Sequence, residues 1–411
     1  MAFVMGMTTV FSFIYIGNPT LYNLVPQRMF AGISNFVLLA IPFFVMTGEV
    51  MTIGGITRDL IRFCNLFVGR LRGGLAHINI TASVFFAGIS GSAASDAASI
   101  GPLLIPAMTE EGYDLDFSAA VTASSAVIGP IIPPSIIMII YASLMDVSVA
   151  GLFLAGYAPG VLLAIFLMIL SYFLSKRKGY PIHTEKISLK ECSQAFKASL
   201  PALLLPFIII VGILSGAFTP TEASVVAAAY AIVLGFVKGS LTYRDIPAIL
   251  TRTMKTSSLI LFLIGTGIAF GWILTFERIP QKLASVLLSL GGSNVHLVLL
   301  LIIIILLVAG MFLDTAVSIV VLGPLLSVAA INIGLHPLHF AIIMCLTLTL
   351  GLITPPLGLV LFVMCGITNL KFEQLCRALL PFIVLEVLVI LIIAYFPTVS
   401  MTIPKMFGFY P

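Results

Sequence analysis

Charged residues are scarce in this chain. Only 9% of its 411 residues are charged and 60% are hydrophobic, whereas soluble domains carry about 25% charged residues. A soluble protein with so few charges could not cover its own surface with polar groups. We therefore expect a membrane protein in contact with lipid. The small net charge of +4 gives no reason to expect a nucleic-acid partner.

Motifs for several other chemistries are missing as well. The five cysteines form no C-x-x-C pair and no His–Cys cluster with zinc spacing, so we interpret them as packing residues. They are Cys64, Cys192, Cys345, Cys365 and Cys376. No G-x-x-x-x-G-K-[ST] phosphate loop occurs, so we expect no direct drive by ATP and no enzymatic activity. Neither a basic region nor a small-residue cleavage site follows Met1, so insertion through the spans is expected rather than a cleavable signal peptide.

Long apolar stretches, by contrast, are abundant. A spanning helix needs about 20 mainly apolar residues. The predicted spans are residues 1–17, 33–53, 117–145, 150–174, 200–217, 221–238, 257–277, 338–369 and 376–396. Two further apolar regions, 74–109 and 294–332, are interrupted by small polar residues at Ser90–Asp96 and Gly310–Thr315. Non-helical backbone at membrane depth is tolerated only inside protein or facing a wet cavity, so each region is predicted to be a re-entrant hairpin.

An internal repeat relates the two hairpins at an offset of 222 residues. Gly101-Pro102-Leu103-Leu104 recurs as Gly323-Pro324-Leu325-Leu326, and Gly129, Pro133 and Pro134 recur as Gly351, Pro355 and Pro356. Adjacent prolines remove backbone donors and clash with the preceding turn, so helices 117–145 and 338–369 should be broken. An odd number of spans separates the hairpins, which inverts the second copy. The sequence therefore predicts an all-α polytopic membrane protein with inverted repeats, an architecture typical of secondary transporters.

The basic residues indicate an orientation. If the N-terminus is cytoplasmic, the outer side holds Arg28, Arg278, Lys282 and Lys405, and the other 16 of the 20 Lys and Arg residues face the cytoplasm. The positive-inside rule expects this bias. We therefore predict a cytoplasmic N-terminus and a periplasmic C-terminus. Residues 240–256 mix apolar and basic side chains and are predicted to form an amphipathic helix at the cytoplasmic interface.

The hairpin tips carry the polar residues. Three serines and Asp96 occupy the first tip, and Asp314 in the second tip stands at the offset position of Ser92. An unpaired ionisable group at mid-membrane costs at least about 2.5–3.5 kcal/mol, which favours an ion or substrate role over mere packing of small residues. Carboxylates beside opened helices favour sodium or a proton over soft metals. The alternative for Asp96 and for Asp314 is that each only caps a half-helix.

Hydroxyl side chains flank both helix breaks. They are Ser124 and Ser125 at the first break, and Thr347, Thr349 and Thr354 at the second. Each could contribute to an ion site, or could simply bond back to the preceding turn. Glu222 follows Thr219 and is interpreted as part of a helix cap. Arg278 and Lys282 follow the only tryptophan, Trp272, and are interpreted as interfacial anchors.

Gly88-Ile89-Ser90-Gly91 matches the G-x-S-G pattern of intramembrane serine proteases. Such an enzyme would need His77, His296, His336 or His339 as the base, and none shares an evident helix face with Ser90. A four-residue match in a glycine-rich membrane protein is weak. The protease is therefore kept only as a remote alternative.

Several motifs resemble the DctM large permease subunit of tripartite ATP-independent periplasmic (TRAP) transporters. These are the run Asn35 to Phe44 (NFVLLAIPFF) with Gly48-Glu49, Ser90-Gly91-Ser92-Ala93, Ile131 to Ser135 (IIPPS), Phe218 to Ala223 (FTPTEA) and Gly351 to Pro356 (GLITPP). The resemblance covers nearly the whole chain. The first span is shorter than is usual in the family, so we expect a truncated chain, a different start or the large half of a fused arrangement.

The resemblance implies a sodium-driven importer of organic acids that works as an elevator in the bacterial inner membrane. The implied substrates are C4-dicarboxylates, sialic acid or similar carboxylates. The implied partners are a small four-helix membrane subunit and a periplasmic substrate-binding protein, besides membrane lipid. A stand-alone sodium/dicarboxylate carrier of the same wider group is the alternative. The wider group shares the inverted hairpins.

Substrate and sodium are expected at the tips and breaks. The substrate is assigned to Ser90, Gly91, Ser92, Pro133, Pro134, Thr315, Pro355 and Pro356. Na⁺ is assigned to Ser92, Ser95, Ser125, Gly129, Asp314, Thr315, Thr349, Gly351 and Thr354. The chain divides into scaffold helices with a cytoplasmic basic loop (1–73), transport repeat 1 (74–146), scaffold and connecting helices (147–293), transport repeat 2 (294–370) and a C-terminal helix and tail (371–411).

Overall fold

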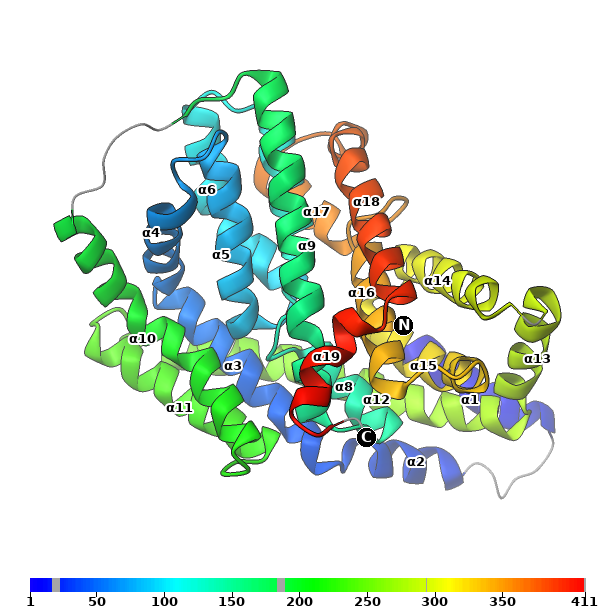
Figure 1. The fold of residues 1–411 in the computed structure, drawn as a ribbon. Helices are drawn as coiled ribbons and strands as arrows, with labels where there is room; N and C mark the ends of the chain where they lie inside the picture. Colours follow the sequence, from blue (N-terminus) through cyan, green and yellow to red (C-terminus); the bar gives the residue numbers. More distant parts are fainter. Residues whose placement is uncertain (17–22, 183–188, 293, 410–411) are drawn as a thin grey trace.

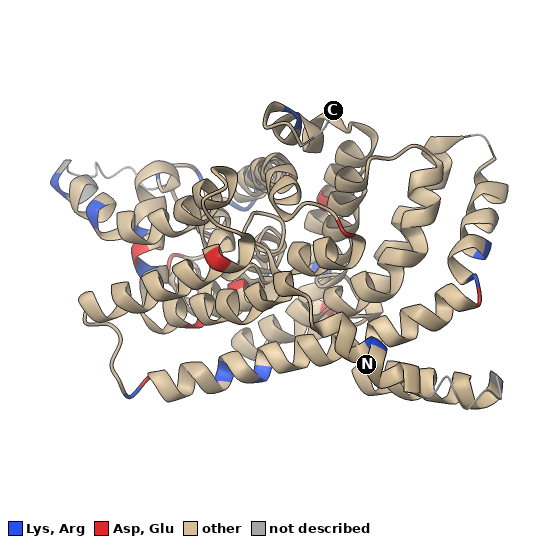
Figure 2. Ribbon diagram, turned by 90° about the horizontal axis from the view of Figure 1, so that it is seen from below, with Lys and Arg blue, Asp and Glu red and all other residues tan. Residues whose placement is uncertain are grey.

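The computed structural model describes residues 1–16, 23–182, 189–292 and 294–409. Lys186, one of the residues counted on the cytoplasmic side, lies outside this part of the chain, as does the side chain of Cys192. All regular elements in the described ranges are helical, and eight helices there are long and apolar enough to cross a membrane. Figure 2 shows how sparsely acidic and basic residues are distributed over the ribbon. The predicted all-α membrane fold is therefore confirmed.

The helices follow one another along the whole chain (Figure 1). They are α1 (Ala2–Ile16), α2 (Leu24–Ile33), the short 3-10 helix η2 (Phe36–Leu39), α3 (Ala40–Ile53), α4 (Ile56–Val68), α5 (Gly74–Ser90), α6 (Ala93–Glu110), α7 (Leu115–Ala126), α8 (Ile136–Met145), α9 (Val149–Lys178), α10 (Leu189–Leu214), α11 (Pro220–Val237), α12 (Ile246–Phe276), α13 (Ile279–Gly291), α14 (Val295–Phe312), α15 (Thr315–Asn332), α16 (Pro337–Gly351), α17 (Leu359–Thr368), α18 (Phe372–Tyr395) and α19 (Thr398–Met406).

Both predicted hairpins are present. Helices α5 and α6 form the first, and α14 and α15 form the second. The predicted broken helices are also present, as α7 with α8 and as α16 with α17. The offset of 222 residues carries both ends of α6 onto the ends of α15, so the repeat seen in the sequence is a repeat of structure. The hairpins approach the centre of the molecule from different sides in Figure 1.

Two groups of helices surround this centre. Helices α9 and α18 pack on the hairpins and broken helices, chiefly on α5, α7 and α16. On the other side, α3 packs against α11 and α12, and α10 packs against α4 and α11. The first group contains every polar tip and break, whereas the second forms a frame against which the tips rest.

Two expectations about the frame were wrong. Residues 240–256 do not form a separate amphipathic helix, because α12 runs without interruption from Ile246 to Phe276. Only Pro247 could break it, and proline is tolerated at a helix start. The basic loop expected near residue 60 is the helix α4, Ile56–Val68. Its charged residues occupy one face and its apolar residues another, a pattern typical of a helix at an interface.

Side chains at the helix ends behave largely as predicted. Thr219 and Glu222 form a reciprocal capping box at the start of α11, which confirms the capping role of Glu222. The Arg28 guanidinium lies over the Trp272 ring at 5.5 Å. At the outer end of the first hairpin, Asp114 accepts hydrogen bonds from Lys178 (2.6 Å) and from Tyr180 (2.9 Å). The hydrogen bonds from Lys178 and then Tyr180 hold the pKa of Asp114 below its ordinary value, and they tie α9 to the hairpin.

Candidate functional site

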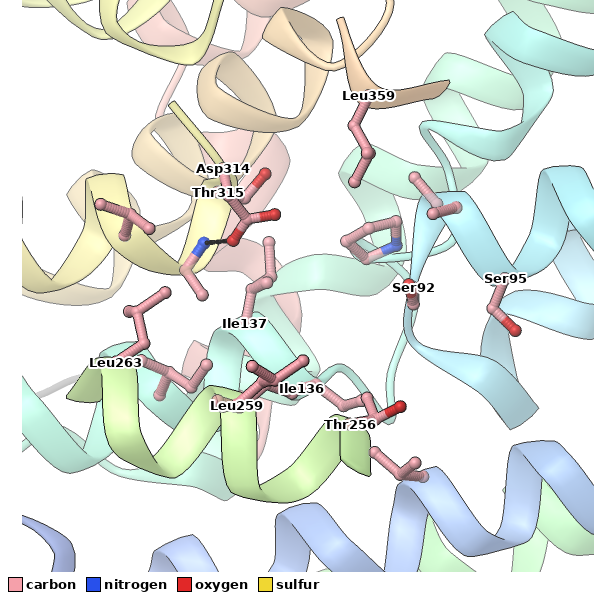
Figure 3. Close-up of a pocket in the computed structure, with 18 of the residues that line it drawn as sticks. Ser92, Ser95, Ile136, Ile137, Thr256, Leu259, Leu263, Asp314, Thr315 and Leu359 are labelled. Atoms are coloured by element: carbon pink, nitrogen blue, oxygen red, sulfur yellow. Dashed lines mark hydrogen bonds between the residues drawn. The ribbon is translucent and has the colours of Figure 1, made fainter. Parts of the chain in front are cut away.

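A cavity of about 660 Å³ lies between the two hairpin tips and the frame. Ser90 to Ser95 line it from the first tip, and Asp314 to Val317 line it from the second. The frame contributes Gly48 and Glu49 of α3, together with Thr256 and several apolar residues of α12. Figure 3 shows Asp314 and Thr315 on one side of the cavity, Ser92 and Ser95 on the other, and α12 beneath them. One cavity therefore joins tips that lie more than 200 residues apart in the sequence.

The first tip turns sharply at a glycine. Gly91 has φ of +58°, in the left-handed region that glycine adopts without strain. A β-carbon at this position would lie 2.8 Å from the Pro134 carbonyl oxygen, so the tip rests directly on the first helix break. The Ser92 backbone N–H donates to Ser90 Oγ over 3.2 Å. Across the frame, a β-carbon at Gly48 would stand 3.5 Å from the Ser90 Cα atom, which shows how closely α3 approaches.

Asp96 is held behind the first tip and does not cap α6, contrary to the alternative drawn from the sequence. Its side chain is fully buried and accepts a hydrogen bond from Ser90 Oγ. Its carboxylate occupies the space in which a β-carbon of Gly129 would stand. The second oxygen, Oδ2, finds no hydrogen-bond donor among the described residues. Ser124 Oγ, on α7, is also buried and unpartnered there. This arrangement offers free oxygen atoms to a cation.

The second tip is built differently. Asp314 caps α15, because its Oδ1 accepts from the Ala316 N–H at 2.9 Å. The capping alternative thus describes its geometry, although the side chain is exposed to the cavity. Behind it, the hydroxyls of Thr315 and Ser318 are buried without a hydrogen-bond partner in the described ranges. Ser318 stands at the offset position of Asp96, so both repeats place an unpartnered oxygen on the same turn.

The hydroxyls at the breaks bond mainly to local groups. Thr349 donates to the Cys345 carbonyl at 2.6 Å, and Thr354 donates to the Leu350 carbonyl at 2.8 Å. Thr347 makes the same kind of bond to Ile343. Each oxygen keeps lone pairs that can still face a cation. Ser125 instead joins α7 to α5, accepting from Ser83 (2.9 Å) and donating to Asn79 Oδ1 (3.2 Å).

Four helix N-termini converge on the cavity. The lining includes first-turn residues of α6, α8, α15 and α17, such as Ala93, Ile136, Thr315 and Leu359. The first N–H groups of a helix lack intrahelical partners, and its macrodipole places partial positive charge there. The described lining contains acidic Glu49 and Asp314 but no Lys or Arg. Glu49 lies 3.6 Å from Arg252, measured between Oε2 and Nη1. An anion in this cavity would therefore meet helix ends rather than basic side chains.

The geometry does not support a serine protease. Ser90 Oγ donates to Asp96, while His77 lies in the first turn of α5, about 20 Å away along the helix. His339 is engaged elsewhere, with Nδ1 2.7 Å from Ser400 Oγ and Nε2 3.2 Å from the Ala394 carbonyl oxygen. His296 and His336 stand at the starts of α14 and α16, at the opposite ends of these helices from the tip and the break.

The structure groups the residues expected at the site into two sets. The cavity lining includes Ser90, Gly91, Ser92, Ser95, Asp314 and Thr315. The second set lies in the breaks behind the tips and outside that lining: Ser125, Gly129, Pro133, Pro134, Thr349, Gly351, Thr354, Pro355 and Pro356. Both Pro-Pro bonds are cis. Sequence reasoning assigned no ligand role to Asp96 or Ser318, although the offset of 222 pairs these two positions.

Comparisons with known proteins agree with this architecture. The family model described as "Tripartite ATP-independent periplasmic transporter, DctM component" matches residues 1–399. The sialic acid TRAP transporter large permease protein SiaM of Vibrio cholerae is 39% identical over 98% of this chain and 96% of its own. The C4-dicarboxylate TRAP transporter large permease protein DctM of Pseudomonas aeruginosa is 39% identical over 93% and 89%. Among solved structures, the YdaH transporter of Alcanivorax borkumensis superposes with a TM-score of 0.68 over 95% of this chain and 88% of its own, at 15% identity.

Proposed function

The chain belongs to the DctM family of tripartite ATP-independent periplasmic transporters, and on that premise we propose that it is the translocating subunit of a sodium-coupled organic-acid importer. It is a multi-pass protein of the inner membrane, and its relatives are transport permeases rather than enzymes. SiaM is named for sialic acid and DctM for C4-dicarboxylates. Both are carboxylates, so a carboxylate is the substrate class proposed here.

The shared cavity is the observation that carries this proposal. Two tips, four helix N-termini and the frame meet around one space of about 660 Å³. Helix N-termini are ready-made sites for anions because their N–H groups and dipoles point at the ligand. The substrate carboxylate would lie between Ser92 and Thr315, with the rest of the molecule against the apolar face of α12. The expected site at the tips thus remains our proposal for the substrate.

Sodium would bind as co-transported cargo behind each tip. The first position has the carboxylate of Asp96 with the Ser90 and Ser124 hydroxyls near the end of α7. The second has the Thr315 and Ser318 hydroxyls, opposite the end of α16. Carboxylate, hydroxyl and carbonyl oxygens suit a hard cation, and the C-terminal ends of the half-helices carry partial negative charge. Two bound sodium ions would also offset Glu49 and Asp314 and admit an anion.

An elevator motion is supported by the smooth contacts between tips and frame. Gly267 on α12 faces Val320 on α15, and Gly48 on α3 faces Ser90. Few side chains interlock at these points, so the group of hairpins and broken helices can slide along the frame. Binding of sodium first and substrate second would draw the two tips together before the movement. This order follows from the need to neutralise the cavity.

Dependence on partners separates this function from a stand-alone carrier. We expect a complex with a small four-helix membrane subunit, and uptake that requires a periplasmic binding protein carrying the organic acid. The test is uptake into proteoliposomes with each component omitted in turn. Uptake of a dicarboxylate by this chain alone would show instead a stand-alone sodium/dicarboxylate carrier.

Asp314→Asn is expected to reduce uptake at limiting sodium about tenfold while leaving the helix intact. Asparagine caps a helix as well as aspartate does, so the bond to the Ala316 N–H is retained and only the charge is lost. Loss of a charged partner is worth about 1.5 kcal/mol or more, close to a factor of ten. Uptake is measured against sodium concentration for the wild type, Asp314→Asn and Ser92→Ala. Normal sodium dependence in Asp314→Asn would leave Asp314 with a capping role alone.

A further inference from the structure

A second buried carboxylate lies far from both tips. Glu386 is in the middle of α18, more than two helical turns from either end of that helix. Its side chain is 1% exposed. Neither Oε1 nor Oε2 has a hydrogen-bond partner within the described part of the chain. Its buried neighbours along the helix are apolar, among them Phe382, Ile383, Val389 and Ile390.

An ionised carboxylate is not stable in such a place. Removing an isolated charge from water costs several kcal/mol even after the protein relaxes, and the group usually becomes neutral instead. A neutral carboxyl has an O–H group that can donate to a carbonyl of the preceding turn. Ionisable residues inside a membrane protein that are retained in this way are often functional.

No charged group on the neighbouring helices is placed to neutralise Glu386. Helices α7, α9, α16 and α17 all pack against α18. Their ionisable residues are Asp116 on α7; Tyr157, Tyr172, Lys176, Arg177 and Lys178 on α9; His339 and Cys345 on α16; and Cys365 on α17. On α18 itself they are Glu373, Cys376, Arg377 and Tyr395.

The charged members of this set lie near the helix ends. Asp116 shares a small surface cavity with Lys371, Glu373 and Arg377 at the start of α18. Arg377 is nine residues from Glu386, about 14 Å along the helix. Lys178 is paired with Asp114. The His339 ring contacts the Ala394 carbonyl, two turns further along α18. No ion pair with Glu386 forms among the described residues.

We propose that Glu386 is a proton-binding site of the block formed by α7, α9, α16 and α18, separate from the sodium positions at the tips. The ligand is a proton rather than sodium, because a proton needs only the carboxyl group itself, whereas sodium needs several oxygen atoms around it. A proton held here keeps the packing of α18 free of charge while the block moves through the membrane. The inference does not depend on the substrate or on the sodium sites.

Infrared spectroscopy of the purified protein in lipid tests this inference. A protonated carboxylic acid has a carbonyl stretching band that is separate from the bands of an ionised carboxylate. At neutral pH and in the presence of sodium, the wild type is expected to show such a band, and Glu386→Gln is expected to lose it. Glu373→Gln, which changes an exposed acid in the first turn of the same helix, should keep it.

Two results would overturn the inference. One is a wild-type spectrum that does not differ from that of Glu386→Gln in this region. The other is a band that appears only when sodium is replaced by choline, because Glu386 would then bind sodium. If Glu386→Gln fails to fold, Glu386→Asp serves instead: it keeps the acid, and its band should persist at a shifted frequency. A complete absence of the band in Glu386→Asp would equally contradict the proposal.

Discussion

Asp96→Asn is expected to raise the sodium concentration needed for half-maximal uptake by roughly 10–100-fold. Asp96 presents one buried oxygen, Oδ2, that has no donor among the described residues, and its carboxylate lies against Gly129 in the first break. Asparagine has nearly the same volume and still accepts from Ser90, but it brings no negative charge. A hydrogen bond or contact to a charged group is worth about 1.5–3 kcal/mol. The substitution should therefore weaken sodium binding much more than folding.

The matched control is Asp146→Asn. Asp146 is exposed at the end of α8 with φ of +52°, a conformation that asparagine tolerates equally well. It undergoes the same chemical change without a place in the cavity or the breaks. Uptake is measured at several sodium concentrations in proteoliposomes that contain equal amounts of each variant. If both variants keep the wild-type sodium dependence, Asp96 is a packing residue and the first sodium position is wrong.

Gly351→Ala is expected to abolish uptake and to lower the free energy of unfolding by about 1–3 kcal/mol. Gly351 ends α16, where the second helix breaks, and a β-carbon there would enter the backbone of Gly310 on α14. Backbone atoms cannot move aside as the end of a flexible side chain can. The contact holds the second tip against its break, so the substitution should separate the Thr315 and Ser318 hydroxyls from the end of α16.

Gly366→Ala provides the control for this effect. Gly366 is also helical, in α17, and no heavy atom lies within 4 Å of the position of its added β-carbon. Alanine is favoured over glycine in a helix by up to about 1 kcal/mol, so this variant should be as stable as the wild type or more so. Thermal unfolding in detergent and uptake are measured for both. Equal unfolding temperatures and equal uptake in the two variants would show that the α14–α16 contact is loose.

The hairpins and breaks could be predicted from the sequence because their causes are local. Adjacent prolines open a helix wherever they occur, and small polar residues within an apolar run mark a tip. The offset of 222 then carried the assignment of Pro133 over to Pro355. For the same reason the capping role of Glu222 was predictable, since Thr219 is only three residues away.

The arrangement of the site could not be predicted, because it depends on distant contacts. That Asp96 turns toward Ser90 and Gly129, and that Ser125 turns toward Asn79 and Ser83, is decided by how α5, α6 and α7 pack. The frame was also missed. The α12 walls of the cavity lie in a helix whose basic first turns suggested a separate segment. A pattern that contains both apolar and charged turns does not show where one helix ends.

The most direct measurement of the central claim is uptake driven by a sodium gradient. The chain is reconstituted with its small membrane partner, and the binding protein loaded with a radiolabelled organic acid is added outside. With sodium outside only, we expect accumulation of the acid inside the liposomes, and almost none when choline replaces sodium at the same pH. Accumulation that is equal in sodium and in choline would contradict sodium coupling at the tips.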